Sequence, residues 1–130
     1  FRRILKPGGK ILILYMAWLP FEDDIAGESE KLVLKYSPEW SGAGETPHPI
    51  FIPECYDSAF ERTWHDEFRL NVHFTRESWN GRMKACRGVG ASLAPDEIRR
   101  WEQEHLKMLE NFPAEFDVLH YAAMAELTMK

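Results

Sequence analysis

A nearly uninterrupted apolar run follows a Pro-Gly-Gly turn near the start of the chain. The turn is Pro7-Gly8-Gly9, and the run extends from Ile11 to Leu19. An apolar run without polar alternation is typical of a strand that is buried on both faces, as in parallel sheets. Such a strand needs covering layers on both faces and hydrogen-bonding neighbours on both edges. The rest of the chain must supply these layers and neighbours.

The composition is that of a globular protein. Of the 130 residues, 45% are hydrophobic and 28% are charged, so we expect a single domain over residues 1–130, with a substantial core. The net charge of −5 argues against a general nucleic-acid partner, because such proteins make many Lys and Arg contacts to phosphates. The apolar run is too short to span a bilayer, and no positively charged leader precedes it, so we expect no membrane partner.

The two cysteines, Cys55 and Cys86, have no close partner spacing. This usage favours reduced thiols with packing roles, in a cytoplasmic protein.

The remaining pattern predicts an alternation of helices and strands. Helices are expected over residues 22–36, 54–62, 76–87 and 95–111, and strands over 11–19, 64–74 and 116–129. The strand over 64–74 alternates in polarity, with one break at Asp66, and this favours a half-exposed edge strand. The last segment is apolar on both parities, which favours an interior strand, although its Ala-rich part leaves a helix open. Residues 37–53 are rich in Pro and Gly and predict a long loop that could act as a lid.

The segments over residues 4–13 and 74–82 together resemble class I S-adenosylmethionine-dependent methyltransferases. The segment Ile4-Leu5-Lys6-Pro7-Gly8-Gly9-Lys10-Ile11-Leu12-Ile13 is similar to the family's turn into its fifth strand. The segment Phe74-Thr75-Arg76-Glu77-Ser78-Trp79-Asn80-Gly81-Arg82 is similar to the part after the sixth strand in the small-molecule branch, which includes the ubiquinone-type and trans-aconitate-type enzymes. The resemblance covers nearly the whole chain and implies an α/β fold. It would be the C-terminal part of a Rossmann-like methyltransferase fold, a three-stranded mixed sheet with flanking helices, in the spatial order first, third, second, with the third strand antiparallel.

The resemblance also bears on the cofactor. Family members hold S-adenosylmethionine with a Gly-rich loop after the first strand and an acidic residue after the second, and both elements would lie upstream of Phe1. The segment Gly88-Val89-Gly90 follows an expected helix, not a strand, and is better explained as a helix terminator. The first five residues look like the end of a helix, which suggests a piece of a longer protein. We therefore expect S-adenosylmethionine to serve the full-length protein, with no cofactor bound to this chain and no activity from the chain alone.

Several side chains are candidates for substrate binding. Ligands of doubly wound folds sit beyond the carboxyl ends of the strands, which here points to Tyr15, Met16 and Trp18, with core packing as the alternative. Positively charged side chains recur at helical spacing after residue 75, and a guanidinium there could bind a substrate carboxylate or phosphate. A solvated face paired with nearby Glu is the other explanation. The candidate substrate-binding residues are Tyr15, Met16, Trp18, Arg76, Trp79, Arg82 and Arg87.

The histidines give weaker signals. His65 and His73 share a strand parity, but a metal site would need a third ligand and tighter spacing, so no metal is expected. His105 falls in the apolar stripe of a helix and predicts a packed core histidine. His48, in the Pro-rich loop, is a hypothetical general base. The sequence identifies no catalytic residue.

These observations lead to two hypotheses about function. The first is the C-terminal portion of an S-adenosylmethionine-dependent methyltransferase that acts on a small molecule. The alternative is a self-contained, non-catalytic α+β ligand-binding or interaction domain, in which Tyr15, Trp18 and Trp79 surround an apolar ligand. Under the first hypothesis strand 11–19 lacks a neighbour on one edge, so we expect a homo-oligomer in which another copy covers that free edge.

Overall fold

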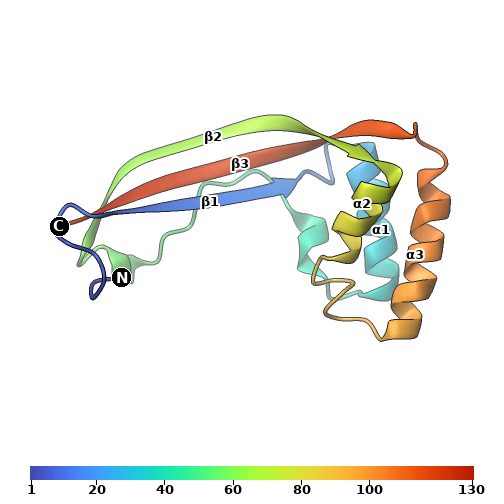
Figure 1. Cartoon of the computed structure of the whole chain (residues 1–130), viewed down its shortest axis with the longest axis horizontal. Coiled ribbons are helices and arrows are strands. Elements are labelled where there is room, and N and C mark those ends of the chain that lie inside the picture. The colour runs from blue at the N-terminus through green and yellow to red at the C-terminus, as the bar shows by residue number, and fades with distance from the viewer. The chain divides into compact units, whose positions relative to one another are not determined.

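The computed structural model describes residues 1–130 and has three long strands and three helices (Figure 1). The elements in chain order are β1 (Lys10–Trp18), α1 (Asp24–Tyr36), the 3₁₀ turns η1 (Ser41–Gly44) and η2 (Glu54–Tyr56), β2 (Phe60–Thr75), α2 (Arg76–Lys84), α3 (Pro95–Leu109) and β3 (Glu115–Met129). The chain forms two compact units. The first unit comprises Phe1–Ala17, Pro47–Leu70 and Tyr121–Lys130, and the second comprises Trp18–Thr46 and Asn71–His120.

The sheet has the order β1-β3-β2, so β3 is the central strand. The amide of Gly8 donates to the Met129 carbonyl at 2.9 Å, and the amide of Leu19 donates to the Leu119 carbonyl at 3.0 Å, so β1 and β3 run antiparallel. On the other side the Lys130 amide donates to the Ala59 carbonyl at 2.9 Å, and His73 lies 3.1 Å from Asp117 at the other end, so β2 is antiparallel to β3 as well. The expected order and the antiparallel third strand are confirmed. The expected mixed sheet is wrong for this chain, because both pairs of neighbours are antiparallel.

The burial of β1 differs from the expectation. The side chains of Leu12, Leu14 and Met16 are 59%, 64% and 52% exposed, whereas Ile11 and Ile13 pack against a small core of the first unit formed by Ala59, Phe60 and Leu127. The prediction of a strand buried on both faces is therefore wrong. A strand at the edge of the sheet has one neighbour, and here only one of its faces meets a packed layer.

A type II turn leads the chain into β1. The amide of Gly9 donates to the Lys6 carbonyl at 2.8 Å, and Gly8 has a φ of 76° at the third position of the turn. Proline at the second position and glycine at the third are the residues that this turn requires, because only glycine adopts positive φ without strain. Before this turn, Leu5 bonds to the Phe1 carbonyl at 3.0 Å in a single helical turn.

The pairing of β2 with β3 changes parity along its length. The hydroxyl of Thr63 lies 2.9 Å from that of Thr128, whereas His73 lies 3.1 Å from Asp117. In a regular antiparallel pair, the residue numbers of two facing side chains add up either always to an odd number or always to an even one. The sum is odd for Thr63 with Thr128 and even for His73 with Asp117, so one strand must contain an extra residue between these contacts. The break in alternation at Asp66 agrees with such a bulge.

Two element predictions are corrected or settled by the structure. The helix expected over 54–62 is only the 3₁₀ turn η2, because β2 begins at Phe60. The last segment is a strand, not a helix, and it is the interior strand of the sheet, as its apolar pattern on both parities predicts.

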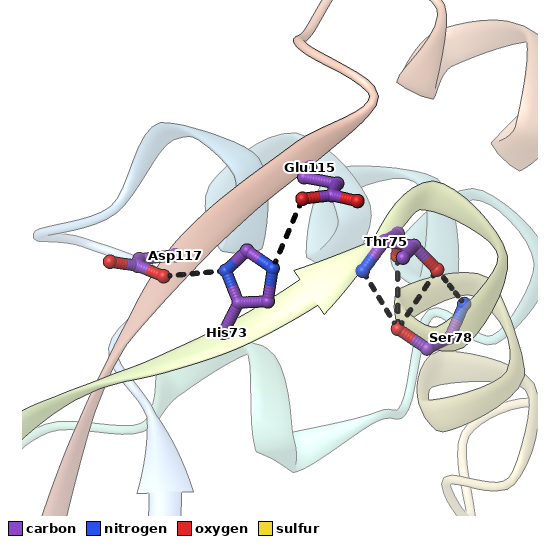
Figure 2. Close-up of polar contacts among 5 residues, drawn as sticks. All are labelled: His73, Thr75, Ser78, Glu115 and Asp117. Atoms are coloured by element: carbon purple, nitrogen blue, oxygen red, sulfur yellow. Dashed lines mark hydrogen bonds and ion pairs between the residues drawn. The ribbon is translucent and has the colours of Figure 1, made fainter.

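Helices α1 and α2 of the second unit begin at side-chain caps. Asp23 caps α1, since one carboxylate oxygen accepts from the Ala26 amide at 2.8 Å, and its other oxygen accepts from the Leu119 amide at 2.8 Å. Thr75 and Ser78 form a reciprocal capping box at the start of α2 (Figure 2). Capping by Asp and Thr satisfies amides that have no partner within the helix.

Helix α3 packs against both α1 and α2 and closes the core of the second unit. The helices α1, α2 and α3 are drawn in Figure 1. None of the helices is both long enough and apolar enough to cross a membrane. The buried core consists of Trp18, Ile25, Ala26, Val33, Trp79, Met83, Cys86, Val89, Trp101, Leu109, Phe116 and Val118.

Substitution by alanine at two glycines of the second unit should have opposite effects on the free energy of unfolding. A Cβ on Gly88 would lie 2.7 Å from the Trp40 ring and 2.8 Å from Val33, so Gly88→Ala should lower the free energy of unfolding by about 1–3 kcal/mol through overpacking. A Cβ on Gly81, inside α2, meets nothing within 4 Å, so Gly81→Ala should raise it by about 0.5–1 kcal/mol. Urea denaturation of the two variants measures the difference, and equal effects would contradict the close packing of Gly88.

Candidate substrate site

Five side chains of the second unit gather around the end of β1. They are Trp18, Phe74, Trp79, Arg82 and His120, and together we call them the Trp18 cluster. The Trp18 ring lies 5.4 Å from the Trp79 ring and 6.2 Å from the His120 ring, centroid to centroid. Phe74 stacks on His120 at 6.0 Å. The cluster joins side chains from β1, β2, β3 and α2.

A buried carboxylate holds Trp18 in place. The indole Nε1 of Trp18 donates to Glu30 Oε1 at 2.7 Å, and the indole of Trp40 donates to Glu30 Oε2 at 2.7 Å. Glu30 is only 2% exposed. Burial raises the pKa of its carboxyl, and the two indole bonds oppose that rise. Because both of its oxygens are engaged, Glu30 serves to position the two indoles.

Arg82 is the exposed charge of the Trp18 cluster. Its guanidinium carbon lies 4.7 Å from the centre of the Trp18 ring, in cation–π contact. The residue is exposed, and none of the ion pairs of the chain includes it. Its N–H donors are therefore available to an oxyanion from outside the chain.

His120 is the buried base of the Trp18 cluster, with 3% of the residue exposed. Its Nδ1 lies 2.8 Å from the Val118 carbonyl. A carbonyl can only accept, so Nδ1 carries the hydrogen and Nε2 of the neutral ring has a free lone pair. Burial lowers the pKa of His120, Arg82 lowers it further, and the Val118 bond and Asp23 act in the opposite direction. Sequence reasoning did not select His120, and a lone histidine in an apolar strand was its only signal.

The other two candidates of β1, Tyr15 and Met16, belong to the first unit. There the Tyr15 ring contacts the rings of His48 at 5.5 Å and Tyr121 at 5.9 Å. Met16 is 52% exposed. His48 also meets the Pro49 carbonyl at 2.9 Å. Of the candidates at the end of β1, only Trp18 joins the cluster.

The three candidate arginines have different surroundings. The guanidinium of Arg76 donates to the Phe112 carbonyl, with Nε at 3.2 Å, and to the Glu110 carbonyl at 3.3 Å, so it caps the end of α3. Arg87 is exposed and has no aromatic partner. Lys84 lies 2.7 Å from Glu102. At this position, the positive side chain is therefore paired with a nearby Glu on a solvated face, which was the other explanation for the positive charges after residue 75.

A second polar network crosses the core of the second unit. Nδ1 of His105 lies 2.8 Å from Asn80 Oδ1, and Asn80 donates to Glu102 at 3.1 Å, which fixes the orientation of the amide. Nε2 of His105 lies 2.9 Å from the Ser29 hydroxyl. This arrangement has the connectivity of a nucleophile and its base, but Ser29 and His105 are both 0% exposed. No substrate can reach them, so the network is structural, and His105 is the packed core histidine that the sequence predicts.

An exposed histidine bridges two carboxylates on the sheet. Figure 2 shows His73 between Asp117, 3.1 Å from Nδ1, and Glu115, 3.6 Å from Nε2. The two carboxylates meet different ring nitrogens, so this is an ion-pair arrangement and not a set of ligands around one point. The chain brings together no group of three or more side chains that could hold a metal ion.

The glycine pair and the cysteines have structural surroundings. The amide of Gly90 donates to the Cys86 carbonyl at 2.9 Å just after α2, as expected of a helix terminator. Cys86 is buried, and burial raises the pKa of its thiol. Cys55 is exposed, and both thiols are free.

The chain was compared with models of known protein families, with curated proteins and with solved structures, and none of the three comparisons finds a match.

The burial of His105 predicts a loss of stability in acid. Burial lowers the pKa of His105 from 6.5 to about 4, so the unfolded chain binds the proton more readily between these values. The free energy of unfolding therefore has its full value above pH 6.5 and falls as the pH drops toward 4. The full shift in the pKa of His105 corresponds to about 3 kcal/mol. The raised pKa of Glu30 acts with the opposite sign, so the comparison must be with a variant that retains Glu30.

Urea denaturation from pH 4 to 7 tests this prediction with His105→Gln, which should show a shallower fall than the parent chain. The exposed His65 provides the control, because His65→Gln should leave the slope unchanged. Parallel pH profiles for the parent chain and His105→Gln would contradict the assignment.

Proposed function

We propose that the chain is the C-terminal portion of a class I S-adenosylmethionine-dependent methyltransferase that acts on a small molecule in the cytoplasm. The observation that carries this proposal is the sheet order β1-β3-β2 with an antiparallel central strand, which is the order that the resemblance implies. The Trp18 cluster lies at the carboxyl end of β1, where ligands bind in such folds. The free thiols of Cys55 and Cys86 agree with a reducing compartment.

Under this proposal the chain supplies the side of the site that binds the methyl acceptor. S-adenosylmethionine would supply the methyl group, and the residues that hold it would lie in a Gly-rich loop outside this chain. The segment Gly88-Val89-Gly90 follows α2 and is packed against Trp40, so it does not offer such a loop. Methyl transfer depends mainly on the alignment of its reactants, which a rigid aromatic site favours.

A non-catalytic α+β ligand-binding domain is the second candidate. It is favoured by the antiparallel pairing on both sides of β3 and by the absence of a cofactor loop between residues 1 and 130. In this case Trp18 and Arg82 would bind a ligand without any transfer step. The surrounding of an apolar ligand by Tyr15 and Trp79 is less favoured, because Trp79 is fully buried and Tyr15 belongs to the first unit.

The coding sequence that precedes the codon for Phe1 separates the two candidates. We expect it to specify a strand, a Gly-rich loop and an acidic residue after a second strand. The full encoded polypeptide should transfer radiolabelled methyl from S-adenosylmethionine, and this chain alone should give no binding heat with the cofactor in calorimetry. A preceding sequence without such a loop would favour the binding domain, and tight cofactor binding by this chain would refute its incompleteness.

We further propose that the free edge of β1 is covered by a second copy of the chain. The exposed residues Leu12, Leu14 and Met16 form an apolar row on this edge strand, and such edges are seldom left open. Leu14→Lys should therefore shift the chain to the monomer in sedimentation velocity. Leu106→Lys, on the exposed face of α3 and 41% exposed, is the matched control. A parent chain that sediments as a monomer would contradict the proposal.

A further inference from the structure

We propose that two adjoining cavities of the first unit bind a free α-amino acid with a large apolar side chain. Asp57 binds the ammonium group of this ligand, Arg62 binds its carboxylate, and the apolar side chain occupies the second cavity. The site goes beyond the proposed function, because it lies in the first unit and involves no methyl transfer.

The two cavities share part of their walls. The first has a volume of about 260 Å³ and only two charged side chains in its lining, which consists of Ile52, Tyr56, Asp57, Phe60, Arg62 and Leu127. The second has a volume of about 300 Å³ and no charged side chain in its lining, and it shares Ile52 and Tyr56 with the first. Volumes of this size are at the low end for small-molecule sites, which favours a ligand as small as an amino acid.

The two charged side chains of the first cavity are opposite in sign and have no partner within the chain. None of the ion pairs includes Asp57 or Arg62, so the two do not pair with each other. A ligand with a single charge would be attracted by one of them and repelled by the other. A free amino acid carries both charges on one carbon atom and therefore complements both side chains.

The backbone of Asp57 is held in place while its carboxylate remains free. Its amide donates to the Glu54 carbonyl at 3.0 Å, in the 3₁₀ turn η2. The ammonium group of Lys130 donates to the Asp57 carbonyl at 2.6 Å, not to the carboxylate. The carboxylate can therefore accept from a ligand ammonium without breaking a contact of the folded chain.

Arg62 borders the apolar floor of the first cavity. It follows Phe60 by two residues in β2, and alternation along a strand places both on the same face of the sheet. Phe60 and Leu127 are 6% and 2% exposed, whereas Arg62 is exposed. An arginine in this position can pack its stem on the floor and keep its guanidinium at the mouth. Its planar fork of donors matches the two oxygens of a carboxylate.

The second cavity offers a surface for an apolar side chain. Ile11 and Ile13 of β1 line it together with Phe51 and Pro53. Phe51 is 82% exposed, so a ligand that covers it removes apolar surface from water. Proline restricts the backbone of this wall, which reduces the entropy lost when a ligand binds. The Tyr56 ring lies between the two cavities and contacts the Phe60 ring at 5.8 Å.

Four probes test the three features of the ligand separately. L-phenylalanine has all three, N-acetyl-L-phenylalanine lacks the ammonium group, L-phenylalaninamide lacks the carboxylate, and L-alanine lacks the large side chain. In NMR titrations of the ¹⁵N-labelled chain, L-phenylalanine should shift the amide resonances of Tyr56, Asp57 and Arg62, with a Kd of about 1 mM or tighter. Each of the other probes should bind about tenfold more weakly or worse.

Variants connect each charge of the ligand with its partner. Asp57→Asn should weaken L-phenylalanine about tenfold and should no longer distinguish it from N-acetyl-L-phenylalanine. Arg62→Gln should weaken it to a similar extent and should no longer distinguish it from L-phenylalaninamide. Glu61→Gln and Arg69→Gln remove the same charges at exposed positions of β2 that line neither cavity, so both controls should bind L-phenylalanine like the parent chain.

Several results would overturn the inference. The site is wrong if L-phenylalanine at about 10 mM shifts no resonance or shifts only resonances of the second unit. Equal binding of N-acetyl-L-phenylalanine would remove the role of Asp57, and equal binding of L-alanine would remove the role of the second cavity. Equal binding of L-phenylalaninamide, which resembles the first residue of a peptide, would exclude a free amino acid as the specific ligand. These titrations use no methyl donor, so their outcome is independent of the methyltransferase proposal.

Discussion

The second unit depends on a carboxylate that is buried without a positive partner. Glu30 is 2% exposed, and its two oxygens accept the indoles of Trp18 and Trp40 at 2.7 Å each. A buried carboxylate is costly unless its oxygens are hydrogen-bonded, so neither indole can move without a penalty. This requirement ties together the end of β1, the middle of α1 and the segment before η1. The position of Trp18, and with it the surface on which Arg82 lies, follows from this constraint.

Two adjacent residues of α1 divide the polar interior of this unit. Glu30 points to Trp18 and Trp40, whereas Ser29 bonds to Trp79 at 2.9 Å and to His105 at 2.9 Å. Neighbouring positions on a helix point about a quarter turn apart, so one segment can serve two networks. Among the side-chain polar atoms that have no contact with solvent, only Nε1 of Trp101 has no hydrogen-bond partner. The interior is thus almost fully satisfied and favours one arrangement of the three helices.

The sequence predicts the elements well where their causes are local. The period of the apolar residues gives the positions of α1, α2 and α3 to within a few residues, because neighbouring positions along the chain decide them. The exposure of β1 could not be predicted, since an apolar strand has the same sequence whether a covering layer is present or not. His120 escaped notice for a similar reason. Its tautomer and its proximity to Arg82 depend on contacts that no spacing in the sequence encodes.

The Trp18 cluster is organised before any ligand arrives. Trp18 is fixed by Glu30, and His120 is fixed by the Val118 carbonyl of its own strand, so neither needs to reorganise on binding. Only Arg82 is exposed, and the Trp18 ring already restricts its guanidinium. A site whose groups are ordered in advance loses less conformational entropy when it binds a ligand. The order of this cluster therefore depends only on contacts within the folded second unit.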